Sequence, residues 1–240
     1  MTDERIKRIS KLRSAMIRPE LGAVAGAVLV FVFFFMIAGD SGMFSPKGIQ
    51  NWTVVSAQFA IIAVGASLLM IAGEFDLSVG SMIGFAGIVI AILSVQWGWP
   101  VWIAIIVAFI VCVSLGALNG FLVIKTGLPS FIVTLAFLYI LRGLTIWLSI
   151  LTTQKTIIGG VKQVAEGDWL APLFGGTILK GLFQWFADIG WIGTFSRGSR
   201  EGQPVIEGIP MLVVWAIVLI IFGQWLLTKT RFGNWIFAAG

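Results

Sequence analysis

The sequence contains no histidine and a single cysteine, Cys112, among its 240 residues. Histidine is the commonest metal ligand and the side chain that most readily changes charge near neutral pH. Its absence argues against a histidine-based metal centre and excludes a Ser-His-Asp catalytic triad. A lone cysteine excludes a disulfide within the chain. The phosphate-binding pattern G-x-x-x-x-G-K-[ST] is also missing. The sequence therefore predicts a protein that is not an enzyme, with no catalytic residues, no metal site and no cofactor.

Charged residues are scarce as well. They make up 11% of the chain, against 58% apolar residues and a mean hydropathy of +1.01, whereas a soluble domain is about 25% charged. The apolar residues fall in long blocks and do not alternate with polar ones, which argues against an outer-membrane barrel. Six blocks are long enough to cross a hydrocarbon core of about 30 Å as helices. They are Leu21–Gly39, Trp52–Gly73, Ser78–Val95, Val101–Ile124, Pro129–Leu151 and Pro210–Thr228. The predicted fold is all-α, a polytopic membrane helix bundle with about six transmembrane helices.

Basic residues gather at one set of span ends. Nine of them precede the first predicted span, follow the fourth or follow the last; they are Arg5, Lys7, Arg8, Lys11, Arg13, Arg18, Lys125, Lys229 and Arg231. With six spans, all nine residues lie on the same side of the membrane. The positive-inside rule indicates that this side is cytoplasmic. We therefore predict a cytoplasmic basic tail over 1–20 and a transmembrane domain over 21–240, surrounded by membrane lipid. The net charge of +5 then requires no nucleic-acid partner.

Residues 152–209 form the longest polar stretch between spans and should lie outside the membrane on the external face. Within it, 170–192 is amphipathic and is broken by Gly175-Gly176, so it cannot span. We expect one or two short helices there, lying at the membrane interface. They would either cover the bundle or offer a docking surface to a partner protein.

Two carboxylates, Glu74 and Asp76, stand between two long uncharged runs. An ionisable group near the centre of a membrane helix costs about 3 kcal/mol, so these groups must lie at an interface, face a wet cavity or have a partner. We interpret the segment as a turn where two membrane helices meet. Ser78 is a candidate N-cap for the following helix, and Asp76 favours its positive end.

The helix after this turn carries small residues on one face, Gly80, Gly84 and Gly87. Such a bare face predicts that another helix or a transported ligand packs closely against it.

Three further polar residues interrupt apolar spans. Asn119 needs a hydrogen-bond partner, either a neighbouring helix or a group in a polar path. Thr134 can bond to its own backbone. Arg142 lies past the middle of its span, where it either extends to the external interface or lines a polar path. A direct pair with Glu74 or Asp76 is disfavoured, because those residues are predicted on the opposite side.

Three ordered blocks carry a resemblance to a known family. Gly73–Ser81, GEFDLSVGS, resembles the signature of the permease subunits of bacterial ABC importers for simple sugars such as ribose, xylose, arabinose and galactose. Leu118-Asn119-Gly120 and the block from Pro129 to Arg142-Gly143 look like a second region of that family. Phe232–Gly240 is similar to a third, with Asn234 where arginine is usual.

The resemblance implies the permease subunit of an importer that carries a monosaccharide across the bacterial inner membrane. It implies three partners: a second permease copy, a cytoplasmic ATP-binding subunit and a periplasmic sugar-binding protein. Family bundles usually contain more spans than this one, so the chain is expected to be truncated at its C-terminal end.

The candidate residues for shaping or gating the substrate pathway are Glu74, Asp76, Ser78, Asn119, Thr134 and Arg142. Capping alone is the alternative role for Asp76 and Ser78. Two other functions stay open. An ion- or proton-coupled secondary transporter would also place carboxylates beside broken helices, and a structural or assembly subunit would have no pathway of its own.

Overall fold

The structure is a computed structural model that describes residues 19–196 and 201–240. Most of the predicted basic tail, residues 1–18, lies outside these ranges. The chain divides at Trp52 into two compact units, each described by itself.

The first unit contains helix α2, Pro19–Ala38, the short 3-10 helix η1, Gly39–Ser41, and the beginning of helix α3, Pro46–Ile71. Phe31 of α2 meets the Trp52 ring nearly edge-on at a centroid separation of 5.4 Å. Helix α3 begins six residues before the predicted start at Trp52. The reason is local: Ser45 caps it by accepting a hydrogen bond from the Gly48 N–H at 3.1 Å, and proline suits the first helical position.

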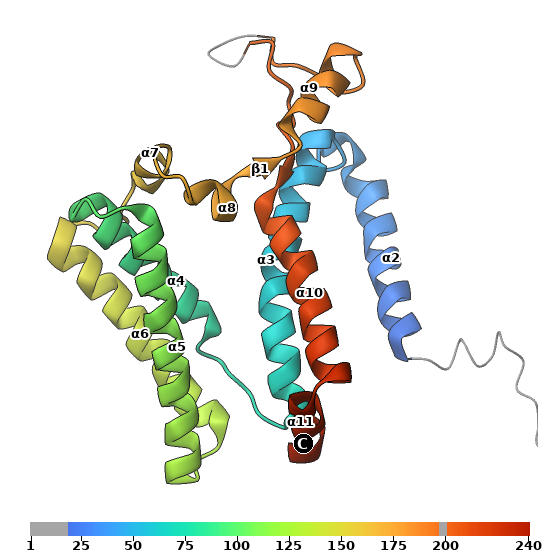
Figure 1. Ribbon diagram of the computed structural model, residues 1–240. Coiled ribbons are helices and arrows are strands. Elements are labelled where there is room, and N and C mark those ends of the chain that lie inside the picture. The colour runs from blue at the N-terminus through green and yellow to red at the C-terminus, as the bar shows by residue number, and fades with distance from the viewer. Residues whose placement is uncertain (1–18, 197–200) are drawn as a thin grey trace, which may run out of the picture. The chain divides into compact units, whose positions relative to one another are not determined.

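Three helices of the second unit pack against one another (Figure 1). They are α4, Val79–Ala91, continued by the π-helical turn η2, Ile92–Gln96; α5, Val101–Thr126; and α6, Ser130–Thr153. Their shared core contains Phe85, Ile88 and Ile92 from α4 and η2, and the fully buried Leu141 from α6. This core fixes α4 between the two helices that bear the polar residues of the site.

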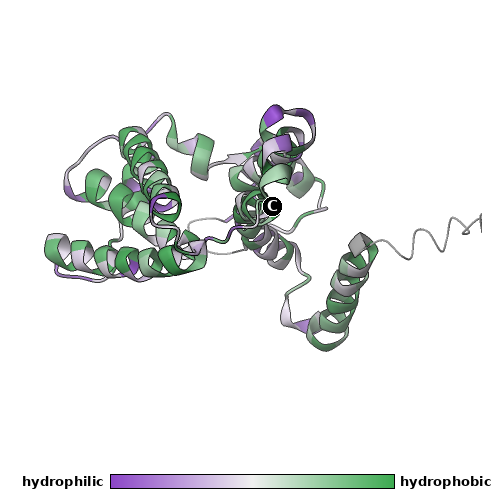
Figure 2. Cartoon of the chain, turned by 90° about the horizontal axis from the view of Figure 1, so that it is seen from below, coloured by the Kyte–Doolittle hydropathy of each residue, from purple (hydrophilic) through white to green (hydrophobic). Residues whose placement is uncertain are grey.

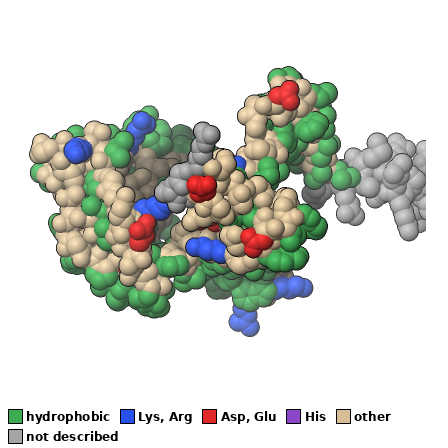
Figure 3. Space-filling model, turned by 90° about the horizontal axis from the view of Figure 1, so that it is seen from above, with side chains coloured by type: hydrophobic (Ala, Val, Ile, Leu, Met, Phe, Trp, Pro, Cys, Tyr) green, Lys and Arg blue, Asp and Glu red, His purple; other side chains and the backbone are tan. Residues whose placement is uncertain are grey.

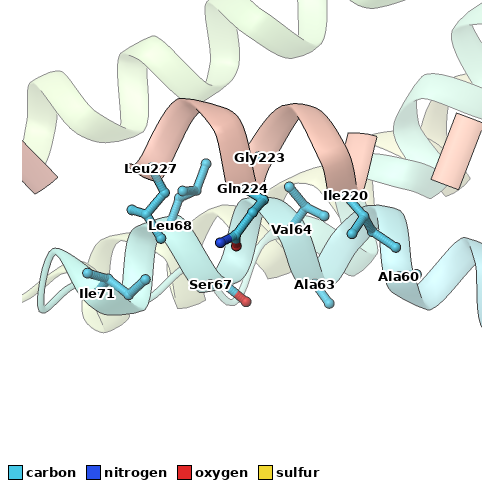
Figure 4. Close-up of a pocket in the computed structure, with 10 residues that line it drawn as sticks. All are labelled: Ala60, Ala63, Val64, Ser67, Leu68, Ile71, Ile220, Gly223, Gln224 and Leu227. Carbon is cyan, nitrogen blue, oxygen red and sulfur yellow. The ribbon is translucent and has the colours of Figure 1, made fainter. Parts of the chain in front are cut away.

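Helix α10, Met211–Lys229, packs along α3. A Cβ atom placed on Gly223 would lie 2.6 Å from Val64 Cγ1, so the absence of a side chain lets the two helices approach closely. Beside this contact runs a groove of about 280 Å³, and Figure 4 shows Gln224 reaching into it.

Helix α11, Arg231–Ala239, follows α10 and was not predicted in the sequence analysis. Thr230 caps its start, because its hydroxyl oxygen accepts a hydrogen bond from the Gly233 N–H.

Between α6 and α10, the described residues form three short helices and both strands of a two-stranded antiparallel ladder. These elements are α7, Val161–Ala165; α8, Ala171–Gly175; β1, Thr177–Ile178; and α9, Lys180–Asp188, with β1 pairing to β2, Ile209–Pro210. The indole N–H of Trp215 donates to the Leu173 carbonyl at 2.8 Å, which fastens α8 to α10. Figure 3 shows acidic and basic side chains scattered over the face seen from above, with neither sign forming one patch.

Asp168 ties this segment to the start of α5. Its carboxylate accepts hydrogen bonds from the N–H of Trp102 at 3.0 Å and from that of Leu170 at 2.9 Å. Desolvation raises the pKa of the Asp168 carboxyl, but backbone N–H groups from Leu170, Trp102, Ala171 and Val101 together outweigh it and hold that pKa below its usual value. The ionised form therefore fits this position at neutral pH.

Within the described ranges, six helices are long and apolar enough to cross a membrane, which confirms the predicted all-α polytopic fold. They are Leu21–Ser41, Pro46–Ile71, Val79–Gln96, Val101–Thr126, Ser130–Thr153 and Met211–Lys229. Figure 2 shows hydrophobic residues over most of each long helix. Apolar side chains all round a helix are what a lipid environment requires.

A polar cavity at the carboxylate turn

Helix α3 ends in a glycine turn that starts the site. Gly73 has a φ of +79°, the left-handed conformation that favours glycine. Its N–H donates to the Met70 carbonyl at 3.0 Å, and the N–H of Glu74 donates to the Leu69 carbonyl at 3.1 Å. This pair of bonds is the Schellman arrangement, which satisfies the last carbonyls of a helix. The chain can therefore leave α3 while the Leu69 and Met70 carbonyls keep hydrogen-bond partners.

The next residues are not helical, and α6 supplies the partners that a helix would have given them. The N–H of Phe75 donates to Ser130 Oγ at 3.0 Å, and the N–H of Leu77 donates to Thr134 Oγ1 at 3.1 Å. Ser130 and Thr134 are four residues apart and so share one face of α6. Non-helical backbone at membrane depth is tolerated where protein groups satisfy it. The turn is thus held by two hydroxyls of a neighbouring helix.

Asp76 and Ser78 close the turn at the start of α4. One carboxylate oxygen, Asp76 Oδ1, accepts from the Ser78 N–H at 2.7 Å and from the Ser78 hydroxyl at 2.6 Å. Ser78 occupies the N-cap position but makes no side-chain capping bond to α4. The predicted N-cap position of Ser78 is therefore confirmed, but its hydroxyl does not cap the helix, because it donates a hydrogen bond to the Asp76 carboxylate instead. Asp76 is the residue that organises this corner.

Asn119 reaches the same corner from α5. Its Nδ2 donates to Ser78 Oγ at 3.3 Å, and the residue is only 4% exposed. Its Oδ1 is buried and has no hydrogen-bond partner within the described chain. One half of the amide thus ties α5 to the turn, and the other half is left as an acceptor without a donor. Buried polar atoms in proteins are rarely left in this state.

These residues border a cavity of about 310 Å³, which we call the turn cavity. Its polar wall consists of Glu74, Asp76, Asn119, Ser130 and Thr134, and its remaining wall is formed by apolar residues and glycines of α3, the turn and α5. Glu74 and Asp76 also border a second hollow, of about 490 Å³, on the α3 side. Five of the six sequence-derived candidates, Ser78 included, therefore meet at one turn.

Arg142 is the candidate that lies elsewhere. It is exposed and borders a separate hollow of about 430 Å³ with Gly80, Ser81 and Gly84 of α4. In the described ranges it forms no ion pair with Glu74 or Asp76, as its position in the span suggested.

The glycine face of α4 is open. A Cβ atom on Gly80, Gly84 or Gly87 would have nothing within 4 Å. Close packing on this face was expected, but no segment of the described chain supplies it. The core is formed instead by an adjoining face of α4, which carries Phe85 and Ile88.

Ser130 is the residue of the site that sequence reasoning missed. The available signal was its spacing of four from Thr134, directly after Pro129 at the start of a span. Thr134 does bond its own backbone, donating to the Ser130 carbonyl at 2.8 Å, as predicted. What the pattern did not reveal is that both hydroxyl oxygens also accept from a distant turn.

Comparison with known proteins places these features in a family. Residues 48–240 match the family described as branched-chain amino acid transport system / permease component. The xylose transport system permease protein XylH of Escherichia coli K12 is 32% identical over 89% of this chain and 61% of its own length. The same-named protein of Haemophilus influenzae is 30% identical over 89% of this chain and 64% of its own length. The fructose import permease protein FruF of Bifidobacterium longum is 31% identical over 77% and 42%.

The chain spans about three fifths of the length of the two xylose permease relatives it matches. No solved structure matches it. The match over 48–240 covers all the residues of the turn cavity. With six apolar helices of spanning length, the chain is a multi-pass protein of the bacterial inner membrane, and it belongs to the family of membrane permease components of branched-chain amino acid-type transport systems.

Proposed function

We propose that the chain is the permease subunit of an ABC importer that carries a monosaccharide across the inner membrane. The observation that carries this proposal is the similarity, over 89% of the chain, to proteins named as xylose transport permeases. A relative named for fructose import extends the likeness to a second sugar. None of these three relatives is named as an ion-coupled carrier, so nothing favours the secondary-transporter alternative.

The proposed partners are a cytoplasmic ATP-binding subunit, a periplasmic sugar-binding protein and a second copy of the permease. ATP hydrolysis belongs to the partner subunit in this scheme. The N-terminus is proposed to be cytoplasmic, in agreement with the basic residues at that set of span ends. The 152–209 segment then lies on the periplasmic side, where it is available to the binding protein.

Glu74, Asp76, Ser78, Asn119 and Thr134 are proposed to shape the substrate pathway at the carboxylate turn. The support is their convergence on one cavity or on its hydrogen bonds. A segment held by a few hydrogen bonds, each worth about 1 kcal/mol net, can change conformation more cheaply than a continuous helix. Arg142 is proposed to line a different part of the pathway, beside the open glycine face of α4.

Transport by reconstituted complexes tests the proposal. The full-length permease, its ATP-binding subunit and its binding protein would be placed in proteoliposomes and offered D-xylose, D-ribose, D-fructose and L-leucine. We expect uptake of a sugar that requires ATP and all three components. Uptake driven by a sodium or pH gradient without ATP would overturn it, and so would ATP-dependent uptake of leucine alone.

A further inference from the structure

The turn cavity contains acceptor atoms that the chain itself does not satisfy. We infer that it is a binding subsite for the hydroxyl groups of a neutral sugar in transit. This inference rests on the proposed function and adds to it a place, a set of contacts and a ligand class. The observation that leads to it is Asn119 Oδ1, buried and unpartnered at the wall of a cavity.

The hydrogen-bond inventory of the cavity is biased toward acceptors. Asp76 Oδ1 is used twice by Ser78, whereas no hydrogen bond is recorded to Asp76 Oδ2 in the described chain. The Glu74 carboxylate and Asn119 Oδ1 add further acceptors on the same wall. On the donor side, Ser130 Oγ accepts from Phe75, which leaves its proton available. A ligand that donates several hydrogen bonds and accepts one fits this wall, and hydroxyl groups do both.

The other wall of the cavity is apolar. Phe75 is 54% exposed and Ile124 is 86% exposed, and both border the cavity. Gly116 and Gly120 of α5 also border the cavity, with nothing within 4 Å of a Cβ placed on either. A sugar ring presents C–H groups on its faces and hydroxyls at its edge, so it matches one apolar and one polar wall. The volume of about 310 Å³ is at the small end for ligand pockets, which run from about 300 to 1,000 Å³.

Charge selects among small ligands. The cavity has two carboxylates and no basic residue on its wall, since Arg142 borders the separate hollow. The carboxylate of a free amino acid would therefore meet like charge without a counter-ion. A bare cation would be attracted by Glu74 and Asp76, but it would leave the apolar wall, Phe75 and Ile124 included, without a contact. A neutral polyol uses both walls and meets no like charge.

Filling the cavity from its glycine side is the sharpest structural test. Gly120→Val adds a side chain that meets no protein atom within 4 Å at its Cβ, so it occupies ligand space and does not strain the packing. The matched control is Gly26→Val in α2, another helical glycine with nothing within 4 Å. In the reconstituted complex we expect Gly120→Val to lower sugar uptake at least tenfold while the control stays within twofold of wild type. Equal uptake by both variants would overturn the subsite.

Thiol protection provides a direct readout of occupancy. Cys112 is the one cysteine of these 240 residues, so Cys112→Ser, with any cysteine elsewhere in the full-length permease also replaced, gives a background free of thiols in this subunit. Ile124→Cys would place a thiol at the turn cavity, and Gln224→Cys would place a matched exposed thiol in the α3–α10 groove. We expect saturating D-xylose, or whichever sugar the uptake assay identifies, to slow modification of Ile124→Cys by a water-soluble methanethiosulfonate at least fivefold, with no change at Gln224→Cys.

The outcomes separate this inference from the proposed function. If the wild-type complex imports a sugar but Ile124→Cys is never protected, or never reacts, the subsite is wrong and the importer stands. If leucine or sodium ions protect the thiol and sugars do not, the ligand class is wrong. If the wild-type complex imports no sugar at all, the proposed function fails, and the subsite fails with it.

Discussion

Two contacts in the second unit hold membrane helices together in opposite ways. Where α10 meets α3, Gly223 lets a helix approach Val64 until atoms touch, and the surrounding groove is almost entirely apolar (Figure 4). At the carboxylate turn, hydroxyls of α6 and the amide of α5 hold a non-helical segment by individual hydrogen bonds.

The difference suggests a physical criterion for where we propose that function lies in such a protein. Lipid is as apolar as leucine, so helices pack in it through shape, and a contact such as Gly223 on Val64 does that with no polar group. A polar turn with an unsatisfied acceptor is not needed for packing of this kind. We propose that it serves a ligand or a movement. The predictions below test each side of this comparison, beginning with the largest expected effect.

Removing the carboxylate that organises the turn should have the largest effect on stability. Asp76→Ala leaves the N–H and hydroxyl of buried Ser78 without their acceptor. An unsatisfied buried donor costs about 1–3 kcal/mol, so we expect a loss of about 2–5 kcal/mol and a clear fall in the thermal unfolding midpoint in detergent. Asp76→Asn keeps an acceptor oxygen and serves as the control. Equal losses in the two variants would mean that charge, and not the acceptor, holds the turn.

Adding a side chain at the apolar contact between α10 and α3 should destabilise the protein through a steric clash. Gly223→Ala places a Cβ 2.6 Å from Val64 Cγ1, and valine is stiff in a helix. Overpacking of this kind costs about 1–3 kcal/mol, measured again by the unfolding midpoint. The double variant Gly223→Ala with Val64→Ala should recover most of that loss. Without recovery, the contact would not be the source of the effect.

Removing one hydroxyl at the turn should have a smaller and more local effect. Thr134→Val keeps the shape of the side chain but leaves the N–H of Leu77 without its acceptor. We expect about 1–2 kcal/mol, seen as roughly tenfold faster hydrogen exchange across 74–78 with little change in α10. Thr145→Val is the matched control, since the hydroxyl of Thr145 donates to the Leu141 carbonyl of its own helix. Equally fast exchange across 74–78 in the control would show that the bond between the Thr134 hydroxyl and the Leu77 N–H does not specifically hold the turn.

The sequence allowed the spans and the turn to be predicted, but not the partners of the turn. Long uncharged blocks identify spans because hydrocarbon excludes charge, and Glu74 and Asp76 marked the turn by the same argument. Hydroxyls in membrane helices usually bond their own backbone, so no local pattern shows that Ser130 and Thr134 also accept from residues more than fifty positions away. Ser78 takes the predicted N-cap position but forms no side-chain bond to the helix, because Asp76, two residues upstream, accepts a hydrogen bond from its hydroxyl.

The smallest effect is expected at the other end of α5, where Asp168 holds the backbone of Trp102 and Leu170. Unlike Asp76, Asp168 lies outside the spans, and its pKa is below the usual value. A carboxyl whose pKa falls on folding stabilises the fold fully above the unfolded pKa of 3.8, and this stabilisation is lost as pH falls through the lower folded value. Asp168→Asn, which cannot titrate, should therefore lower the unfolding midpoint slightly at pH 7, and the difference from wild type should shrink as the pH is lowered and the wild-type carboxyl becomes protonated. A constant difference between the two proteins as the pH is lowered would show that the ionised carboxylate does not secure this segment to α5.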